Sequence, residues 1–258
     1  MAIDFELDAE GVATITINRP ERLNAMDEEH YRGLSQAWLR VRDDPAVRVA
    51  IITGTGDRSF TTGADIKSFI TRPPSLSEMW LTQREQLLNR GLEVWKPVIA
   101  AVNGYCLGGG MTLLMATDIR LSAPHATYSL AEVKRGVIAG NGGTQRILSQ
   151  LPYAIAMEML LTGETIDAET AARWGLVNRI VPAGDLLGEA RATARKIAAN
   201  APLAVQAAKE LAIRAREMPL TTGLRMEQLV NRMLAFTEDA AEGPRAFSEK
   251  RQPDFKGE

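Results

Sequence analysis

The stretch over residues 96–117, KPVIAAVNGYCLGGGMTLLMAT, constrains the fold more than any other part of the chain. Its apolar run over 98–102, rich in β-branched residues, predicts a buried strand. Three consecutive glycines, 108–110, follow, and the apolar segment 111–116 predicts a buried helix. The order of strand, glycine turn and helix indicates an α/β core.

The three glycines allow two interpretations. At the start of a helix, backbone N–H groups carry partial positive charge, and glycine has no side chain to keep a ligand away from them. Such a turn can hold an oxygen that carries or develops negative charge. Three glycines also let a backbone turn or pack tightly, and this stretch alone leaves both interpretations open.

The composition is that of an ordinary soluble protein, with 258 residues, 45% hydrophobic and 24% charged. The formal charge of -2 gives no support to a nucleic-acid partner. The start, MAIDFELDAEG, lacks the features of a signal peptide, and no apolar run approaches the ~20 residues that span a bilayer. A single cysteine, Cys106, excludes a disulfide within the chain. We therefore expect a cytoplasmic protein without a membrane partner.

Several common sites lack their sequence patterns. His30 and His125 are too few and too isolated for a zinc site, so we expect no metal and place both histidines at the surface. The glycines at 54 and 56 lack the third glycine of a dinucleotide-binding turn. No P-loop or GxSxG motif occurs either.

Hydrophobic periodicity gives a coarse map of the elements. Alternating or apolar runs predict strands at 3–7, 12–18, 47–53, 98–102, 118–122, 127–130 and 177–181. Helical spacing predicts helices at 28–42, 76–94, 111–116, 143–151, 155–162 and 168–174. Asp27 and Asp167 stand where they can cap the helices that follow them.

The chain becomes almost wholly helical from about residue 185. Helical spacing continues near 185–200, 202–217, 220–236 and 238–250. This change in pattern predicts two parts, a core over 1–184 and a helical region over 185–258.

Five blocks together resemble a known family. They are INRPERLNAM (17–26), FTTGADIK (60–67), PVIAAVNGYCLGGG (97–110), GGTQR (142–146) and TEDAAEGPRAFSEKRQPDF (237–255). In this order and at these separations they resemble the crotonase superfamily, the enoyl-CoA hydratases and isomerases. The resemblance implies an α/β spiral of repeated strand-strand-helix turns. It also implies that the C-terminal helices form a homotrimer, which often pairs into a hexamer.

The resemblance implies an acyl-CoA thioester as substrate, with no cofactor other than its coenzyme A. Two backbone N–H groups hold the thioester oxygen in this family, and by position they belong here to Ala64 and Gly109. Removing a proton beside a thioester makes an enolate, and preorganised donors stabilise the charge on its oxygen.

Other positions of the family's substrate site carry over by the same resemblance. The coenzyme A site would include Arg22, Ala25, Asp65, Ile66 and Lys67. Phe247 and Lys250 stand where family members reach a neighbouring subunit's nucleotide. For Arg22 and Lys67 the alternative is a solvated surface side chain, and for Phe247 it is a place in the core.

The catalytic carboxylates are where the sequence departs from the family. Hydratases of the family use two glutamates, whose positions are Thr112 and Glu132 here. A threonine hydroxyl cannot serve as a general base near neutral pH. Asn141 stands where many relatives have a small or acidic residue, and it either orients a substrate group or only suits a turn. Lys134 and Arg135 are expected to face solvent.

The resulting hypothesis is an acyl-CoA-processing enzyme of the hydratase/isomerase family, with Glu132 as its single acid/base and Thr112 beside the substrate. A hydratase is expected from similarity. Isomerisation of a 3-enoyl to a 2-enoyl thioester needs only one carboxylate and is the mechanistic alternative, with decarboxylation a further one. A catalytically weak acyl-CoA binding protein is the alternative from another class.

Overall fold

The structure is a computed structural model that describes residues 1–67 and 86–258. Its larger sheet has the order β1-β2-β3-β5-β7-β10, in which only β1 and β2 pair antiparallel. These strands are β1 Ile3–Leu7, β2 Val12–Ile17, β3 Val49–Gly54, β5 Val98–Val102, β7 Ile119–Ser122 and β10 Arg179–Ile180.

The second sheet has the order β4-β6-β8-β9, with β9 antiparallel to β8. Its strands are β4 Ser59–Thr61, β6 Tyr105–Leu107, β8 Thr127–Ser129 and β9 Ile166–Asp167. The chain passes from the first sheet to the second three times, through the pairs β3–β4, β5–β6 and β7–β8. This alternation confirms the predicted spiral of strand-strand-helix turns.

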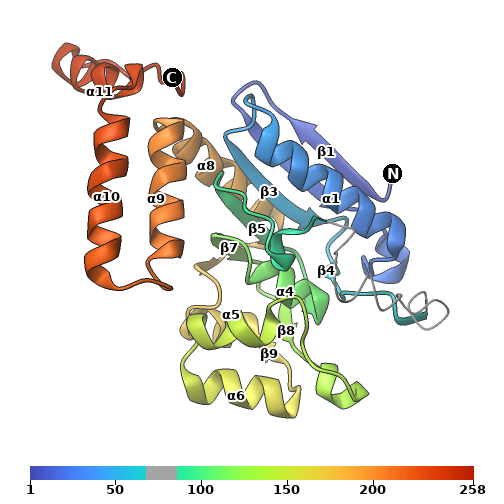
Figure 1. The fold of residues 1–258 in the computed structure, drawn as a ribbon. Coiled ribbons are helices and arrows are strands. Elements are labelled where there is room, and N and C mark those ends of the chain that lie inside the picture. Colours follow the sequence, from blue (N-terminus) through green and yellow to red (C-terminus); the bar gives the residue numbers. More distant parts are fainter. Residues whose placement is uncertain (68–85) are drawn as a thin grey trace.

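Helices follow most of these strand pairs (Figure 1). Within the described residues lie the α-helices α1 Glu28–Asp43, α4 Gly109–Leu114, α5 Gly143–Gln150, α6 Tyr153–Thr162, α7 Ala168–Arg173, α8 Leu186–Ala198, α9 Pro202–Arg214, α10 Leu220–Leu234 and α11 Glu238–Glu249. Short 3-10 helices lie at η1 Pro20–Arg22, η2 Leu88–Arg90, η3 Glu132–Arg135 and η4 Ala183–Asp185. The Asp27 side chain accepts from the amides of Glu29 and His30, which confirms its predicted cap.

The central strands β3 and β5 of the larger sheet are buried on both faces, which explains their continuous apolar runs. On one face α1 packs Leu34, Trp38 and Val41 at helical spacing. On the other face the buried alanines of α8 lie against β3 and β5. The predicted boundary between a core and a helical region at residues 184 and 185 stays a prediction. The helix α8, which begins just after this boundary, packs on the larger sheet.

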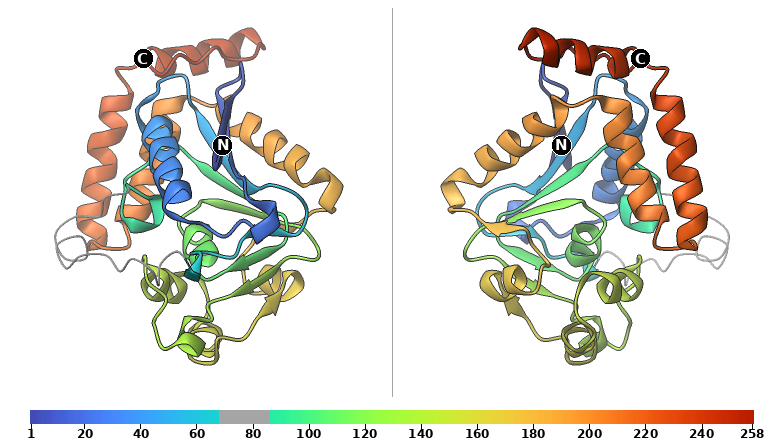
Figure 2. Two further views of the ribbon diagram at one scale, coloured as in Figure 1. Left: turned by 90° about the vertical axis from the view of Figure 1, so that its right-hand side faces the viewer. Right: turned by 90° about the vertical axis from the view of Figure 1, so that its left-hand side faces the viewer.

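The helices α9 to α11 extend away from the sheets (Figure 1). Both views of Figure 2 show α10 along one side of the molecule and α11 across its top. None of the helices in 1–67 and 86–258 is both long and apolar enough to cross a membrane.

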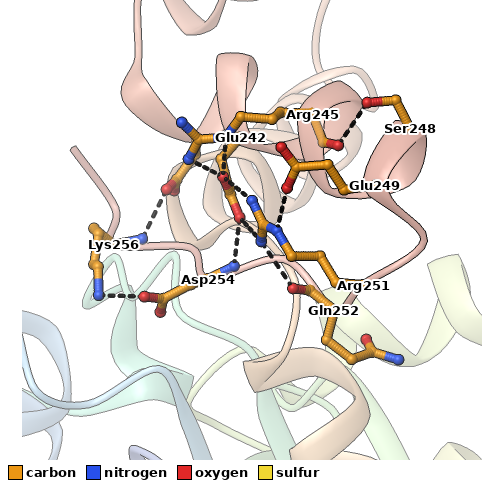
Figure 3. Close-up of polar contacts among 9 residues, drawn as sticks. Glu242, Arg245, Ser248, Glu249, Arg251, Gln252, Asp254 and Lys256 are labelled. Carbon is orange, nitrogen blue, oxygen red and sulfur yellow. Dashed lines mark hydrogen bonds and ion pairs between the residues drawn. The ribbon is translucent and has the colours of Figure 1, made fainter.

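A polar cluster ties the C-terminal segment to α11 (Figure 3). Glu242 accepts hydrogen bonds from the side chains of Arg245 and Arg251 and, at 3.0 Å, from the amide of Asp254. Asp239 accepts from the amides of Lys256 at 2.7 Å and Gly257 at 2.9 Å. Both carboxylates are buried, and these donors satisfy them.

Two sequence predictions are wrong. Of the helix predicted over 76–94, residues 76–85 lie outside the described residues, and the rest contains only η2. Leu87 is extended and Gly91 has a φ of 96°, so the backbone on either side of η2 is not helical. His30, predicted at the surface, is buried on α1, and its Nδ1 lies 2.7 Å from Asp27 Oδ1. His125 is exposed, as predicted.

Candidate active site

The first candidate oxyanion donor is the amide of Ala64, just beyond β4. Residue 64 pairs with Met26 in a parallel bridge. The Met26 amide donates to the Gly63 carbonyl, and the Asp65 amide donates to the Met26 carbonyl, both at 2.8 Å. In this pattern the N–H of Ala64 points away from Met26. Ala64 as a whole is exposed.

The second candidate donor is the amide of Gly109, the first residue of α4. Gly108 takes a φ of 53° and donates to the carbonyl of Ser129, which turns the chain from β6 into the helix. First-turn amides have no partner within their own helix. Within the described residues, neither the Gly109 amide nor the Ala64 amide has a protein acceptor.

The two donor segments are in close contact. A Cβ atom added to Gly63 would lie 2.5 Å from the Gly109 nitrogen, and one added to Gly109 would lie 3.5 Å from the Ala64 nitrogen. Any side chain at Gly63 would therefore collide with the second donor. The glycines at these positions bring two amides together and leave room beside them for an oxygen atom.

Glu132 lies next to this pair. It is the first residue of η3, and a Cβ atom on Gly108 would lie 3.4 Å from its Oε1. Its Oε2 is buried and has no hydrogen-bond partner among the described residues. Burial raises the pKa of the Glu132 carboxyl, and its own backbone amide and Arg135 offset only part of that rise.

Thr112 occupies the first turn of α4 and is only 2% exposed. Its hydroxyl donates to the carbonyl of Gly109 at 3.0 Å and accepts from Asn89 Nδ2 at 2.9 Å. The proton of this hydroxyl is therefore already used within the protein. Sequence reasoning missed Asn89, because it lay inside a predicted helix without any motif.

Comparisons with known proteins give the relatives of this chain. The family model for enoyl-CoA hydratase/isomerase matches residues 8–258. The chain is 44% identical to the (E)-benzylidenesuccinyl-CoA hydratase of Thauera aromatica, over 95% of this chain and 96% of the relative. It is 40% identical to the carnitinyl-CoA dehydratase of Salmonella arizonae, over 95% of both chains.

This chain belongs to the enoyl-CoA hydratase/isomerase family. It is thus an enzyme, a hydratase or an isomerase, that acts on acyl-CoA thioesters. The crystal structure of an enoyl-CoA hydratase from Bacillus anthracis matches it with a TM-score of 0.92 at 34% identity, over 100% of both chains. The fold predicted from the resemblance is therefore confirmed.

The coenzyme A positions implied by the family gather around Ala64. Arg19, which the sequence analysis missed, donates from Nη1 to the Ala25 carbonyl at 3.2 Å and to Asp65 Oδ2 at 3.0 Å. The other carboxylate oxygen of Asp65 accepts from the Lys67 amide at 3.1 Å. Arg22, Ile66 and Lys67 are exposed around this cluster. Their roles in coenzyme A binding stay predictions.

Phe247 and Lys250 lie elsewhere, on α11 and at its C-terminal end, at the opposite end of the molecule from α6 (Figure 1). Phe247 is 87% exposed, which excludes the alternative that it belongs to the core. Lys250 ends the helix with a φ of 55°. Their predicted contact with a neighbouring subunit stays a prediction. Lys134 and Arg135 face solvent, as expected.

The described residues offer no cluster of three or more His, Cys, Asp or Glu side chains that could hold a metal ion. Of the residues named as catalytic, the spiral brings Ala64, Gly109 and Glu132 into one place. Thr112 lies in the first turn of α4, where it bonds to the Gly109 carbonyl, and Asn141 lies between η3 and α5.

Proposed function

We propose that this enzyme adds water to the double bond of a 2-enoyl-CoA thioester, or removes it in the reverse reaction. The proposal rests on one observation, the grouping of the Ala64 and Gly109 amides with the half-buried carboxyl of Glu132. The names of the two curated relatives, a hydratase and a dehydratase, support the same class of reaction.

The two amides would bind the thioester oxygen. When an oxygen nucleophile attacks carbon 3, the electron pair of the double bond moves toward the carbonyl and the thioester oxygen gains negative charge. The N–H groups of Ala64 and Gly109 are aimed at this oxygen before the reaction begins. One such donor lowers the barrier by about 2.7–4 kcal/mol.

Glu132 would move the proton. Its ionised carboxylate takes a proton from water as the water oxygen bonds to carbon 3, and the resulting carboxyl group gives that proton to carbon 2 of the enolate. One molecule of water is added, and the carboxylate is regenerated. One carboxyl group can therefore serve as both base and acid, without a second acid at position 112.

Thr112 supports isomerisation as a second candidate. Its hydroxyl bonds to Gly109 and Asn89, so the position of the family's other glutamate offers no base for water. Isomerisation needs no water, since Glu132 could take a proton from carbon 2 of a 3-enoyl thioester and return one at carbon 4. The enolate would use the same two donors.

Product analysis separates the two candidates. The purified protein is incubated with crotonyl-CoA and, separately, with 3-hexenoyl-CoA in ¹⁸O-labelled water. Labelled oxygen in the product of the first ester supports the hydratase, and a shifted double bond without labelled oxygen in the second selects the isomerase. Binding of both esters with turnover of neither would contradict both candidates and favour a binding protein.

We also propose that the enzyme is a cytoplasmic homotrimer or a dimer of trimers that needs no cofactor beyond the coenzyme A of its substrate. The C-terminal region from α10 to α11 exposes large apolar side chains, among them Leu220, Met233, Phe236 and Phe247. Exposed apolar groups of this size favour self-association. Sedimentation velocity should give the mass of three or six chains, and a monomer would contradict the proposal.

A further inference from the structure

The amide of Ala64, the first candidate oxyanion donor, stands at the end of a chain of two peptide groups. The Gly63 carbonyl belongs to the same peptide group as the Ala64 N–H, and it accepts from the Met26 amide at 2.8 Å. The Met26 N–H shares its peptide group with the Ala25 carbonyl, which accepts from Arg19 Nη1 at 3.2 Å. Both peptide groups are trans, so the C=O and N–H of each point in opposite directions. The chain of hydrogen bonds therefore runs from the Arg19 guanidinium to the Ala64 N–H.

The Arg19 guanidinium is also held by two carboxylates. Its Nη1 donates to Asp65 Oδ2 at 3.0 Å and lies 3.2 Å from Asp27 Oδ2. All three side chains are half-buried, where bonds between charged groups are stronger than in water. Arg19 thus bonds to the residue before Met26 and to the residue after Ala64, and it braces the bridge between these two from both sides.

The starting point of this chain is rigid. The Arg19 amide donates to Asn24 Oδ1 at 3.0 Å, and the buried Asn24 donates from Nδ2 to the carbonyl of Ser59, the first residue of β4, at 2.7 Å. Burial alone would raise the pKa of Asp27, but hydrogen bonds from His30 and the charge of Arg19 outweigh it and lower that pKa. Asp27 is therefore ionised at neutral pH and pairs with Arg19.

We propose that Arg19 is a positioning residue that orients and polarises the Ala64 oxyanion donor through these two peptide groups. This inference rests on the proposed function, in which the Ala64 N–H binds the thioester oxygen. A cation at the start of a hydrogen-bond chain strengthens each bond that follows, because every group in the chain polarises the next. The negative charge that develops on the thioester oxygen then meets a stronger and better-oriented donor.

Infrared spectra test the donor directly in an ester that binds without reacting. The probe is butyryl-CoA labelled with ¹³C at its thioester carbonyl, and its C=O stretching frequency should be lower when bound to the wild type than in water. Arg19→Gln removes the charge and should lose part of this shift. Arg19→Lys keeps the charge on a shorter side chain without the planar fork, so its shift should lie between the other two.

Kinetics should give the same order. Because the effect of Arg19 is greatest when charge develops on the oxygen, kcat should fall about tenfold in Arg19→Gln, less than for outright loss of a donor. The KM should change by less than about threefold. Arg32→Gln is the matched control, since Arg32 is exposed on α1 and pairs with Glu28 at 3.4 Å. Its carbonyl shift and kcat should equal those of the wild type.

The outcomes separate this inference from the proposed function. A full wild-type shift in Arg19→Gln, with only a lower melting temperature, would show a merely structural role and overturn the inference. If Arg19→Gln does not fold, Arg19→Lys decides, and a full wild-type shift there overturns it as well. No shift in the wild type would contradict the two oxyanion donors themselves, and with them both the proposed function and this inference.

Discussion

At the scale of single residues, Glu132 combines access to the oxyanion donors with partial burial. Its Oε2 has no partner among the described residues, and burial raises the pKa of its carboxyl. A buried carboxylate without a partner is less stable than one in water. The same feature makes the group a stronger base once it is ionised.

Glu132→Gln tests this residue directly. The amide cannot take a proton, so turnover should fall by about 10²–10⁴-fold. The melting temperature should stay the same or rise, because a neutral side chain replaces a partly buried charge. Glu164→Gln is a suitable control, since Glu164 is exposed and pairs with Lys134. Turnover at the wild-type rate in Glu132→Gln would exclude its role as acid/base.

The pH dependence follows from the raised pKa of Glu132. The ionised, basic form of Glu132 predominates only above that pKa. As the pH is lowered, kcat/KM should therefore begin to fall at a higher pH than it would if the base were an ordinary glutamate. The folded state holds this proton more tightly than the unfolded state, so the group's contribution to stability falls as pH rises through the window between the two pKa values. Kinetic and melting profiles across the acidic range measure both effects. An acid limb at the pKa of an exposed glutamate would argue against this interpretation.

At the scale of elements, the candidate oxyanion site depends on two turns that touch. One follows β4 and the other joins β6 to α4. Gly63 has a φ of 84°, and a Cβ atom there would lie 2.5 Å from the Gly109 nitrogen. The glycine is needed for its lack of a side chain as well as for its conformation.

Two glycine variants separate these requirements. Gly56 has a φ of 82° and nothing within 4 Å of an added Cβ atom, so Gly56→Ala introduces only backbone strain. Gly63→Ala adds the same strain and also pushes the two donor segments apart. It should lower kcat about 10²-fold or more, the effect of losing one oxyanion donor, while Gly56→Ala should lower only stability. Equal kcat values for the two variants would show that the contact does not matter for catalysis.

At the scale of the whole molecule, the C-terminal cluster fixes the segment after α11. Hydrogen bonds from Arg251, the Asp254 amide and Arg245 hold the pKa of Glu242 well below its usual range. Stability from a depressed carboxyl pKa is present above the ordinary pKa and is lost as the pH falls toward the depressed one. This cluster therefore holds the C-terminal segment in place at neutral pH.

Glu242→Gln should loosen this segment. An amide provides weaker acceptors for the two arginines, so we expect a lower melting temperature and faster tryptic cleavage at Arg251. Glu249→Gln is the control, because Glu249 lies on the same helix, is exposed and pairs, within residues 1–67 and 86–258, with Arg251 alone. If the two variants are cleaved at the same rate, the buried carboxylate does not hold the segment.

The sequence by itself determined most of the elements and the identities at the candidate site. Alternation and apolar runs located strands such as β2 and β5, and Asp27 and Asp167 marked helix starts, because these signals depend on neighbouring residues alone. The family blocks pointed to Ala64, Gly109 and Glu132. Short strands such as β4 and β6 were missed, since three residues are too few for a periodic signal.

Only the tertiary structure decided which groups meet and which are buried. Asn89 bonds to Thr112, and Arg90 and Arg146 both bond to Asn141. His30 is buried. Local sequence patterns predict neither these contacts nor this burial. The pKa of Glu132 depends on desolvation, which is a property of the packed molecule. The sequence therefore pointed to the candidate site residues, while packing set their distances, burial and partners.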